Sequence, residues 1–594
     1  MNPSDAPLYD LRPWEARYGT DIPRHLKPPA HSNLAGLVAQ ASATYGKQCA
    51  FTCVVGNGMN GSLSFSQVDE LSDAFAAYLR LELKVAAGAR VAVQLPNGLA
   101  YPVVAFGVFK AGCVLVNTNP LYTPTEMRHQ FSDAGAEVVV ITELFADKLE
   151  GLMGSTPLKH VVVASVPEMF PAIPRGIVRA VQRYWNRALP EIRTPHQRFM
   201  AAIEAGRRQL QGQGGRSVVG SWWKSIGLED TACLQYTGGT TGVSKAARLT
   251  HGNLLANLQQ ILAMGGRFIE PGKECVLTAL PLYHIFAFTA NLLSFYSVGA
   301  RNVLIPSPRP VQNLQRAIEN TPVTWITGVN TLFNALLNEE WFVAYPPRKL
   351  KAAIAGGTAL HRAVSERWEQ VTGTRIAEGY GLTESSPVVT FNPLSGERHN
   401  DSIGIPVPGT EVRLIDDSGS PAALGQPGEL IARGPQVMPG YWQQPQETAQ
   451  VLRDGWLYTG DVAVMEADGF FRIVDRKKDL ILVSGFNVYP NEVEDAVAEL
   501  DAVMEAAVVG IPDARSGEAV RVYVVRRDDS LTAEQVLTHC RTRLTDYKLP
   551  KSVVFRDELP KSPIGKILRK DLKAEVKTEF TRSPAAAADE RKSA

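Results

Sequence analysis

The fold and function of this chain turn on one stretch, Tyr236-Thr237-Gly238-Gly239-Thr240-Thr241-Gly242-Val243-Ser244-Lys245, which follows the apolar, strand-like residues 232–235. Glycine lets backbone N–H groups approach an anion closely, the hydroxyls add neutral donors, and Lys245 adds a point charge. This composition suits a polyphosphate, although such a run also suits a surface turn. It is not a Walker A loop, because no glycine is followed at the required distance by Gly-Lys-Ser/Thr.

The size and composition of the chain indicate an ordinary globular protein of several units. Its 594 residues are too many for one hydrophobic core, so we expect about three or four structural units. Hydrophobic residues make up 45% and charged residues 20% of the chain, as in water-soluble domains. The 61 basic and 60 acidic residues nearly cancel, so the overall charge does not indicate nucleic acid as a partner. Any attraction to a membrane must therefore be local.

Cysteine usage and the apolar runs favour a reducing compartment without a membrane span. The six cysteines show no CxxC pair and no zinc spacing. The first residues carry neither a charged lead nor a long apolar run, so we expect no secretory signal. The longest apolar segment, 285–300, contains Asn291 and two serines, and it is shorter than the roughly 20 residues of a spanning helix. These features favour the cytoplasm.

The N-terminal half alternates short β-rich runs with helix-like runs. Helical apolar spacing predicts helices over 33–45 and 65–81, with Ser66 as the cap of the second. Strand-like and helix-like runs then alternate over 90–95, 101–111, 114–116, 125–134 and 138–141. A second such series extends from 276 to 354. Alternation of this kind is typical of parallel strands with crossover helices, and it predicts two layered α/β lobes.

Residues 167–223, between the two series, have a different character. Arginines recur there every four residues, at Arg175, Arg179, Arg183 and Arg187, and apolar residues fill much of the remainder. This spacing aligns the arginines on one face of a helix. A basic amphipathic helix can lie on an anionic membrane. A solvated arginine face on an ordinary surface helix is the alternative.

The C-terminal part predicts two smaller units. From about residue 404 the chain is rich in β-formers and turns, as in 411–415 followed by Asp-Asp-Ser-Gly, which predicts a small antiparallel unit. Beyond residue 479 the sequence predicts strands at 520–525 and 553–556 and helices at 491–500 and 533–544, enough for an independent α+β domain. The tail from Lys577, rich in alanine and charge, has no reason to fold.

Five further motifs follow the Gly/Thr-rich stretch: Pro281-Leu282-Tyr283-His284, Glu378-Gly379-Tyr380-Gly381-Leu382-Thr383-Glu384, Tyr458-Thr459-Gly460-Asp461, Asp475-Arg476-Lys477-Lys478-Asp479 and Pro560-Lys561-Ser562-Pro563-Ile564-Gly565-Lys566. In type and order, the six resemble the signatures of the adenylate-forming superfamily, which contains acyl-CoA synthetases, nonribosomal-peptide adenylation domains and luciferases. The runs 280–287, 327–333 and 481–490 resemble bacterial long-chain fatty acyl-CoA ligases in particular. The resemblance covers nearly everything from Asn33 to about Lys573.

The resemblance implies a two-step reaction. A fatty acid carboxylate attacks the α-phosphorus of ATP to give acyl-AMP and pyrophosphate, and the thiol of coenzyme A then attacks the acyl carbon and expels AMP. Both steps bring anions together, so fixed donors and Mg²⁺ should provide most of the catalysis. The implied partners are fatty acid, ATP and coenzyme A, and no nucleic acid. The alternatives are a fatty acyl-AMP ligase, a medium-chain or aryl acid:CoA ligase, and a non-catalytic fatty-acid-binding protein.

The resemblance also implies a nucleotide site drawn from all of these motifs. The phosphates would be held by Tyr236, Thr237, Gly238, Gly239, Thr240, Thr241, Gly242 and Lys245. Thr241 and Glu384 would also hold Mg²⁺, since this cation takes hard oxygen ligands. Tyr380 would stack on the adenine, and Asp461 and Arg476 would bind the ribose. The remaining residues of the implied site are Gly356, Gly379, Gly381, Thr383, Ser484 and Gly485.

The implied catalytic residues are Lys566, Thr241, Glu384 and His284. Lys566 would stabilise the pentavalent phosphorus during adenylation and withdraw for thiolation, a task that suits a compact, movable cation. Lys478 lies at the hinge position, where backbone rotation would exchange Lys566 for the face that carries Ser484 and Gly485.

The acyl group is expected beside His284, with Phe288 as an aromatic gate and Val329 as a further contact. From the residues alone, His284 also suits a core histidine, and the run around Phe288 suits a core as well as a tunnel. One departure from the usual pattern follows the Gly/Thr-rich stretch, at Ala246, Arg248 and Gly252.

These expectations combine into one organisation. Residues 1–476 form a large AMP-binding domain of α/β class, with two layered lobes, a small β-rich unit and the basic insertion at about 167–223. Residues 477–576 form a small, mobile α+β domain, and 577–594 form a disordered tail. We expect a cytoplasmic protein, attached peripherally to the inner membrane through the arginine-rich helix, and a homodimer is left open.

Overall fold

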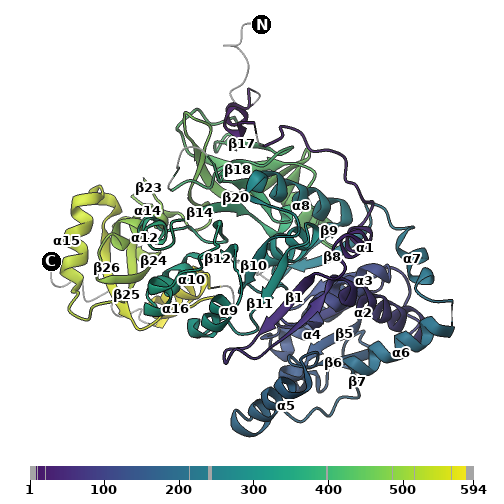
Figure 1. Cartoon of the computed structure of the whole chain (residues 1–594). Coiled ribbons are helices and arrows are strands. Elements are labelled where there is room, and N and C mark those ends of the chain that lie inside the picture. The colour runs from purple at the N-terminus through teal and green to yellow at the C-terminus, as the bar shows by residue number, and fades with distance from the viewer. Residues whose placement is uncertain are drawn as a thin grey trace.

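Four β-sheets and the helices that cover them make up the molecule (Figure 1). The computed structural model describes residues 9, 11–20, 22–212, 214–237, 244–395, 399, 401–484, 486–513, 515–562 and 565–582. Two large sheets lie in the N-terminal part with a smaller third sheet, and the fourth lies in the C-terminal part. The mixed α/β class with a large and a small domain is therefore confirmed.

The first lobe is a seven-stranded sheet in the order β7-β6-β5-β3-β4-β8-β9. Its strands are β3 (Arg90–Gln94), β4 (Val114–Asn117), β5 (Ala136–Thr142), β6 (His160–Ala164), β7 (Gln197–Arg198), β8 (Thr231–Tyr236) and β9 (Ala246–Thr250). All neighbours pair in parallel except β8 and β9, which are antiparallel. Helices α3 (Ala100–Lys110) and α4 (Pro124–Ala134) connect parallel strands, as the alternating pattern predicts. The Gly/Thr-rich stretch thus joins the end of β8 to the start of β9.

The second lobe is a nine-stranded sheet in the order β16-β15-β14-β13-β12-β10-β11-β1-β2. Its strands are β1 (Cys49–Val54), β2 (Asn60–Ser64), β10 (Cys275–Thr278), β11 (Arg301–Leu304), β12 (Trp325–Gly328), β13 (Ala352–Gly356), β14 (Ile376–Gly381), β15 (Val388–Phe391) and β16 (Ile405–Pro406). Its helices are α9 (Gln315–Asn320), α10 (Asn330–Leu337), α11 (Glu340–Ala344) and α12 (Arg362–Thr372). Because β1 pairs in parallel with β11, the N-terminal hairpin belongs to the second lobe, which the sequence did not predict.

A shared layer of helices joins the two lobes. It contains α1 (Leu34–Tyr45), α2 (Phe65–Ala77), α8 (His251–Gly265) and the buried π-helical segment η7 (Ala287–Phe295). These helices and strands of both sheets contribute to one core cluster. The expected cap of α2 was wrong by two residues. Ser64 is the cap, because its hydroxyl accepts the Gln67 N–H at 3.2 Å while the Gln67 amide accepts the Ser64 N–H at 2.8 Å.

The third sheet is the small antiparallel unit that the sequence predicts. It comprises β17 (Glu411–Ile415), β18 (Gly428–Arg433), β19 (Leu452–Arg453), β20 (Trp456–Met465) and β21 (Phe471–Arg476). Helix α13 (Pro445–Val451) lies between β18 and β20 along the chain. The short connection 477–480 then leads into the C-terminal part.

The C-terminal part contains the fourth sheet and three helices. Its elements are β22 (Ile481–Val483), β23 (Phe486–Val488), α14 (Pro490–Ala498), β24 (Val503–Asp513), β25 (Gly517–Arg526), α15 (Ala533–Arg543), β26 (Pro550–Arg556) and α16 (Arg569–Arg582). The tail boundary at 577 was wrong, because α16 continues to Arg582. Leu572 and Val576 of this helix are buried, and Glu579, beyond the expected boundary, pairs with Arg521 at 2.7 Å. Residues 583–594 lie outside the described part of the chain.

The 167–223 stretch forms α5 (Ala172–Ala180), the π-helical turn η5 (Val181–Trp185), α6 (Phe199–Gly212) and α7 (Ser217–Trp223). The expectation that Arg187 continues the arginine face was wrong. The helix ends at Trp185, and Arg187 has a left-handed backbone with φ 49°. Among the residues described, no helix has both the length and the hydropathy to cross a bilayer.

Candidate active site

Hydrogen bonds join the two ends of the Gly/Thr-rich stretch. The Thr237 N–H donates to the carbonyl of Lys245 at 2.9 Å, and the Ser244 hydroxyl donates to the carbonyl of Thr237. Tyr236 is buried, and its hydroxyl donates to Asp133 on α4. Only the backbone of Tyr236 is therefore available to contact a phosphate. Gly238, Gly239, Thr240, Thr241 and Gly242 lie outside the described residues, so their expected phosphate and metal roles stay predictions.

Three residues expected to bind adenosine form one network. The Tyr380 hydroxyl, at the end of β14, donates to Asp461 Oδ2 at 2.6 Å. Asp461 on β20 and Arg476 on β21 are cross-strand partners, with Arg476 Nε 3.1 Å from Asp461 Oδ1. Burial, followed by the Asp461 charge, raises the pKa of Tyr380 well above its usual range, so this phenol stays a donor. Residues far apart in sequence thus meet where a planar base and a diol could bind.

Neighbouring atoms approach two of the expected glycines closely, and at Gly381 the approach requires glycine. A Cβ at Gly381 would lie 1.8 Å from the carbonyl oxygen of Pro387, which no side chain tolerates. A Cβ at Gly356, at the end of β13, would lie 3.2 Å from the Gly379 carbonyl and 3.1 Å from the Phe286 ring. The absence of side chains here brings β13, β14 and the His284 region together.

Glu384 suits Mg²⁺ in its chemistry. It lies in the one-turn helix Thr383–Ser385, half-buried, and its carboxylate accepts the Tyr441 hydroxyl at 2.7 Å. Among the described residues no three carboxylate, histidine or cysteine side chains form a ready metal cage. A single carboxylate is what Mg²⁺ usually takes from a protein when phosphates and water supply the other ligands. Glu384 therefore fits a shared metal site.

The loop 280–284, which carries His284, is fixed by side chains of the first lobe. Asn97 donates to the carbonyls of residues 278 and 280 at 3.0 and 2.9 Å and accepts the N–H of residue 282 at 2.8 Å. Tyr101 donates to the carbonyl of residue 282 at 2.9 Å, and Gln235 to that of residue 283 at 3.0 Å. Five hydrogen bonds thus set the position of His284.

Electrostatics distinguish His284 from Lys566. Burial, with the Lys566 charge second, lowers the pKa of His284 to about 4, so the imidazole is neutral at pH 7. Burial, with Arg476 second, lowers the pKa of Lys566 to about 7. Asp461 opposes that shift in Lys566. A lysine poised between charged and neutral lies beside a neutral histidine, as is common in active sites.

The loop that carries Lys566 packs against the second lobe. Gly565 is buried with φ 87°, and a Cβ there would lie 2.8 Å from the Thr331 hydroxyl, 3.1 Å from the Arg309 guanidinium and 3.5 Å from Val329. Val329 immediately precedes α10 and is itself buried. The structure therefore brings Lys566, Val329 and the His284 loop together, across the boundary between the large and small domains.

The expected hinge residue Lys478 and the expected thiolation residue Ser484 are both exposed. The Lys478 carbonyl accepts a hydrogen bond from the Lys573 ammonium at 3.2 Å. Partial burial of the Lys478 ammonium lowers its pKa to about 8. Ser484 has a left-handed backbone with φ 53°. Gly485 lies outside the described residues. Among the described residues, contacts therefore join Tyr380, Asp461 and Arg476, whereas the expected roles of Lys478 and Ser484 stay predictions.

Phe288 lies in η7, fully buried, with its ring edge-on to Phe109 at a centroid distance of 6.3 Å. Phe106 and Phe109 of α3 belong to the same core cluster as Phe288. π-helical segments are frequent at functional sites, since they widen a helix locally. Its role as a gate for the acyl chain stays a prediction.

Four residues with clear contacts to this site escaped the sequence analysis. Asn97 and Tyr101 hold the His284 loop, and Tyr441 and Glu447 contact Glu384 and Lys245 respectively. Their neighbours in sequence carry no chemical pattern. The only signal was Pro445 shortly before Glu447, which marks the start of a helix.

Comparison with known families defines the class of protein. The family model for AMP-binding enzymes matches residues 39–442, and the model for the C-terminal domain of these enzymes matches residues 492–566. The chain therefore belongs to the AMP-binding enzyme family. The fold is also that of the crystal structure of the anthranilate CoA ligase AuaEII with anthranoyl-AMP, at a TM-score of 0.80 and 24% identity, covering 95% of this chain and 99% of that one.

Particular relatives narrow the class further. The chain is 49% identical to a long-chain-fatty-acid–CoA ligase of Yersinia pestis, over 95% of this chain and 98% of the relative. It is 47% identical to the enzyme of that name from Escherichia coli O157:H7, over the same shares of the two chains. Among solved structures, ATP-bound MatB from Rhodopseudomonas palustris matches at 26% identity and a TM-score of 0.76, covering 92% of this chain and 100% of that one.

Proposed function

We propose that the chain is an ATP-dependent ligase that converts long-chain fatty acids to fatty acyl-CoA through an acyl-AMP, releasing AMP and pyrophosphate. The observation that carries this proposal is the position of Lys566, which the small domain places near Asp461, Arg476 and His284. A cation that arrives from a separate domain suits a reaction in which two steps use one site in turn. The relatives at 47% and 49% identity support the same substrate class.

In the first step, a carboxylate oxygen forms a bond to the α-phosphorus and the bond to pyrophosphate breaks. Two anions must meet, so the barrier falls mainly through positioning and charge stabilisation. Protonated Lys566 supplies charge to the carboxylate and the α-phosphate oxygens. Neutral His284 orients the acyl carboxylate without adding charge, and Asp461, with Arg476, holds the ribose. Bound Mg²⁺ supplies charge neutralisation for the phosphates, and Glu384 would hold it.

In the second step, the thiol of coenzyme A attacks the acyl carbon and AMP leaves. Lys566 must make way, so the small domain rotates about Lys478 and presents the face of β22 and β23. Two exposed apolar side chains on that face, Leu482 and Phe486, support this proposal, since they are 49% and 58% exposed. Exposed apolar groups on a small domain are typical of a surface that is covered in another state.

A product assay tests the proposal directly. Purified protein with palmitate or oleate, ATP, Mg²⁺ and coenzyme A should form AMP and pyrophosphate in amounts equal to the acyl-CoA formed. AMP released without coenzyme A would favour a fatty acyl-AMP ligase. ADP as the product, or an intact nucleotide with every acid from about eight to eighteen carbons, would refute the proposal.

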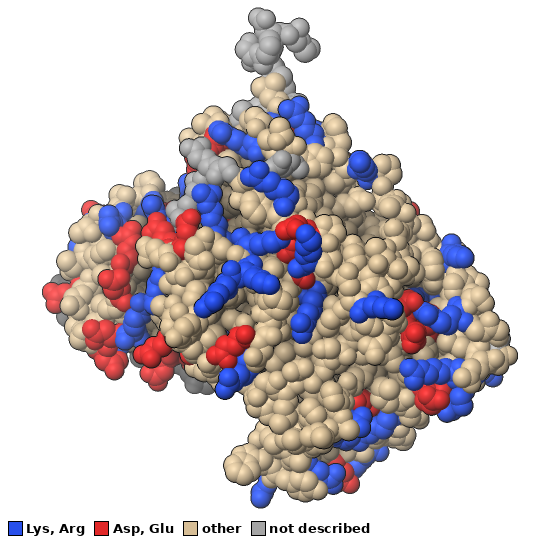
Figure 2. Space-filling model, viewed as in Figure 1, with Lys and Arg blue, Asp and Glu red and all other residues tan. Residues whose placement is uncertain are grey.

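We further infer that α5 and η5 dock on anionic lipid. Three large apolar or aromatic side chains on this segment are strongly exposed: Ile173 at 77%, Tyr184 at 75% and Trp185 at 87%. Arg175 and Arg183 lie on the same segment, and the region of α5 shows blue side chains among uncharged atoms in Figure 2. Apolar insertion and arginine contacts to headgroups act together in such helices.

The docking proposal predicts flotation of the protein with vesicles that contain phosphatidylglycerol, and much less with phosphatidylcholine alone. Trp185→Ser together with Ile173→Ser should abolish flotation. Tyr345→Ser is the matched control, because Tyr345 is 76% exposed but lies outside this segment. Flotation that survives the double change would refute a role for α5 and η5.

A further inference from the structure

A segment between β18 and β20, residues 439–452, lies against the strand that follows the Gly/Thr-rich stretch. The Arg248 N–H donates to the carbonyl of Gly440 at 3.0 Å, and the Trp442 N–H donates to that of Ala246 at 2.8 Å. The chain then turns and continues into α13. The 439–452 segment is therefore attached to β9 by backbone hydrogen bonds, close to Lys245.

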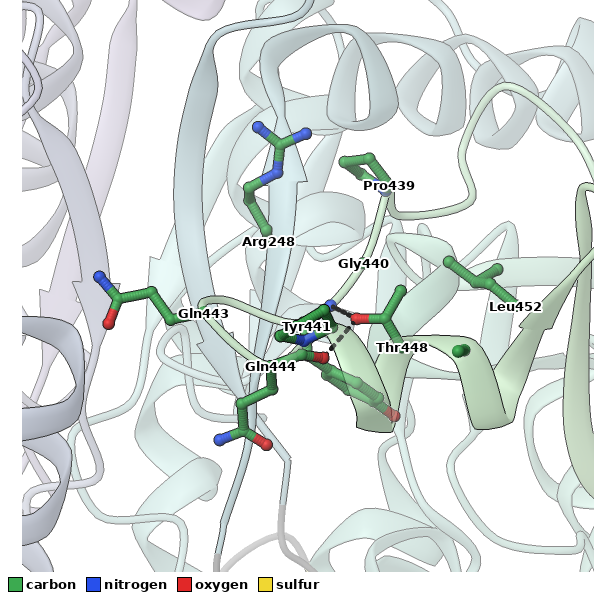
Figure 3. A pocket seen from close by; sticks show the side chains of 10 residues that line it. Arg248, Pro439, Gly440, Tyr441, Gln443, Gln444, Thr448 and Leu452 are labelled. Atoms are coloured by element: carbon green, nitrogen blue, oxygen red, sulfur yellow. Dashed lines mark hydrogen bonds between the residues drawn. The ribbon is translucent and has the colours of Figure 1, made fainter.

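The turn of this segment is closed by Thr448. Its hydroxyl accepts the N–H of Tyr441 at 2.9 Å and donates to the carbonyl of Gln444 at 2.8 Å, as the dashed lines in Figure 3 show. Gly440 has φ 151°, and a Cβ there would lie 2.8 Å from Thr448 Cγ2. These contacts fix the direction of the two side chains that leave the segment, those of Tyr441 and Glu447.

Both side chains contact residues assigned to the nucleotide. The Tyr441 hydroxyl donates to Glu384 Oε1 at 2.7 Å, and the Glu447 carboxylate pairs with the Lys245 ammonium. The Lys245 ammonium also lies 5.5 Å from the centre of the Tyr441 ring. One short segment thus contacts the expected phosphate lysine of the first lobe and the expected metal carboxylate of the second.

We propose that Glu447 and Tyr441 are positioning residues for the ATP phosphates: Glu447 holds Lys245, and Tyr441 holds Glu384, in the arrangement that the bound nucleotide meets. The proposal rests on the proposed function, because that function gives Lys245 and Glu384 their roles. In this proposal the 439–452 segment forms part of the phosphate site, together with Lys245 of the first lobe and Glu384 of the second.

The number of N–H donors on Lys245 favours a role in which Glu447 positions this lysine over one in which Glu447 blocks it. A lysine ammonium has three N–H donors, so Lys245 can keep Glu447 and still donate to a phosphate. Its long side chain loses rotamer freedom when it binds, and a partner that orders it beforehand reduces this loss. The Tyr441 phenol acts in the same way on Glu384, because its O–H donates to Oε1 at 2.7 Å.

The segment has open space on its other side. A cavity of about 550 Å³ lies there, with Arg248, Gln444 and Leu452 in its wall (Figure 3). On the side of this cavity the turn is closed by the two hydrogen bonds of the Thr448 hydroxyl. Thr448→Val should therefore weaken ATP binding in the same direction as a change at Glu447, without touching Lys245 itself.

The test compares Glu447→Gln, Lys245→Met and the double variant. We expect Glu447→Gln to raise the KM for ATP, and the dissociation constant of a non-hydrolysable ATP analogue, about three- to ten-fold while kcat stays within about two-fold. The double variant should bind no worse than Lys245→Met, because Glu447 acts through Lys245. Glu447→Asp should restore part of the affinity. Glu137→Gln, which removes a carboxylate from an exposed lysine pair elsewhere, is the control.

The outcomes separate the two proposals. An unchanged or lower KM in Glu447→Gln would overturn positioning, the lower value indicating that Glu447 masks Lys245. Additive losses in the double variant would also overturn it, since the two residues would then act independently. Failure of the wild-type protein to form AMP would instead refute the proposed function, whatever the variants do.

Discussion

The loop that carries His284 and the loop that carries Lys566 meet in one site but are held in opposite ways. Asn97, Tyr101 and Gln235 hold the first with five hydrogen bonds from the first lobe. The second is stabilised by its own turn, in which the N–H of residue 562 donates to the Lys566 carbonyl at 2.7 Å and the Lys566 N–H donates to the hydroxyl of residue 562 at 3.1 Å.

This difference indicates a division of labour. The neutral group is built into the large domain, whereas the cation is carried on a preformed turn that packs against that domain through Gly565. A turn that keeps its shape when undocked can leave and return without refolding. The same site can therefore hold a charge for one reaction step and lose it for the next.

Removal of the movable cation should give the largest effect. Lys566→Ala should slow acyl-AMP formation by about 10²–10³-fold, the usual cost of losing one preorganised charge donor. Thiolation of supplied acyl-AMP should change little, because Lys566 has withdrawn in that step. The two half-reactions are measured separately by quenched-flow or pyrophosphate release. Equal loss in both would contradict the division of labour, and Lys570→Ala, an exposed lysine of α16, serves as control.

Loosening of the fixed loop should act on both steps. Asn97→Ala removes two hydrogen bonds from the loop 280–284 and a third from the end of β10. We expect unfolding free energy to fall by about 2–4 kcal/mol, because buried polar groups lose their partners. Both half-reactions should slow by about ten- to a hundred-fold, since His284 shifts. Chemical denaturation and the two half-reaction assays measure these effects. Asn60→Ala, on an exposed turn, is the control, and selective loss of adenylation alone would count against the loop's role.

The sequence could predict the site where residue type and order carry the information. Tyr380, Asp461 and Arg476 lie in separate motifs of the sequence, and the structure joins them by one hydrogen bond and one ion pair. The same reasoning predicts a role for Lys566 at the nucleotide, and the charges of Arg476 and Asp461 act on its ammonium. Chemistry that requires particular side chains leaves them recognisable in the sequence.

Other features could not be predicted because they depend on contacts between distant segments. The pairing of β1 with β11 depends on which edge is free in the folded sheet. The continuation of α16 to Arg582 includes a contact with a distant strand, the ion pair of Glu579 with Arg521 of β25. Tyr441 and Glu447 are ordinary in sequence, and only the turn closed by Thr448 directs them toward Glu384 and Lys245.

The pH dependence of adenylation should distinguish Lys566 from His284. Burial lowers the pKa of Lys566 to about 7 and that of His284 to about 4. Adenylation requires the charged lysine, so kcat/KM for ATP should decline above pH 7, about five-fold between pH 7 and 8 for a single proton. His284 should add no limb in this range. Docking of the small domain depends on pH in the opposite direction. Docked Lys566 has a lower pKa than an undocked lysine, so docking costs free energy while the lysine is charged. This cost diminishes as the pH rises from about 7 toward the usual pKa of lysine. A kcat/KM profile without a limb near pH 7 would contradict the buried position of Lys566.

The smallest effect is expected from loss of the hydrogen bond between the Tyr441 hydroxyl and the Glu384 carboxylate. Tyr441→Phe keeps the ring beneath Lys245 and removes only the O–H that reaches Glu384. We expect the Mg²⁺ concentration for half-saturation of ATP-analogue binding to rise about two- to five-fold, because an unheld carboxylate must be ordered on binding. Binding measured with a chelator in place of Mg²⁺ should be equal in both proteins. A loss that persists in the chelator would show that Tyr441 acts through Lys245 instead, and the fixed side of the phosphate site would then rest on Glu447 alone.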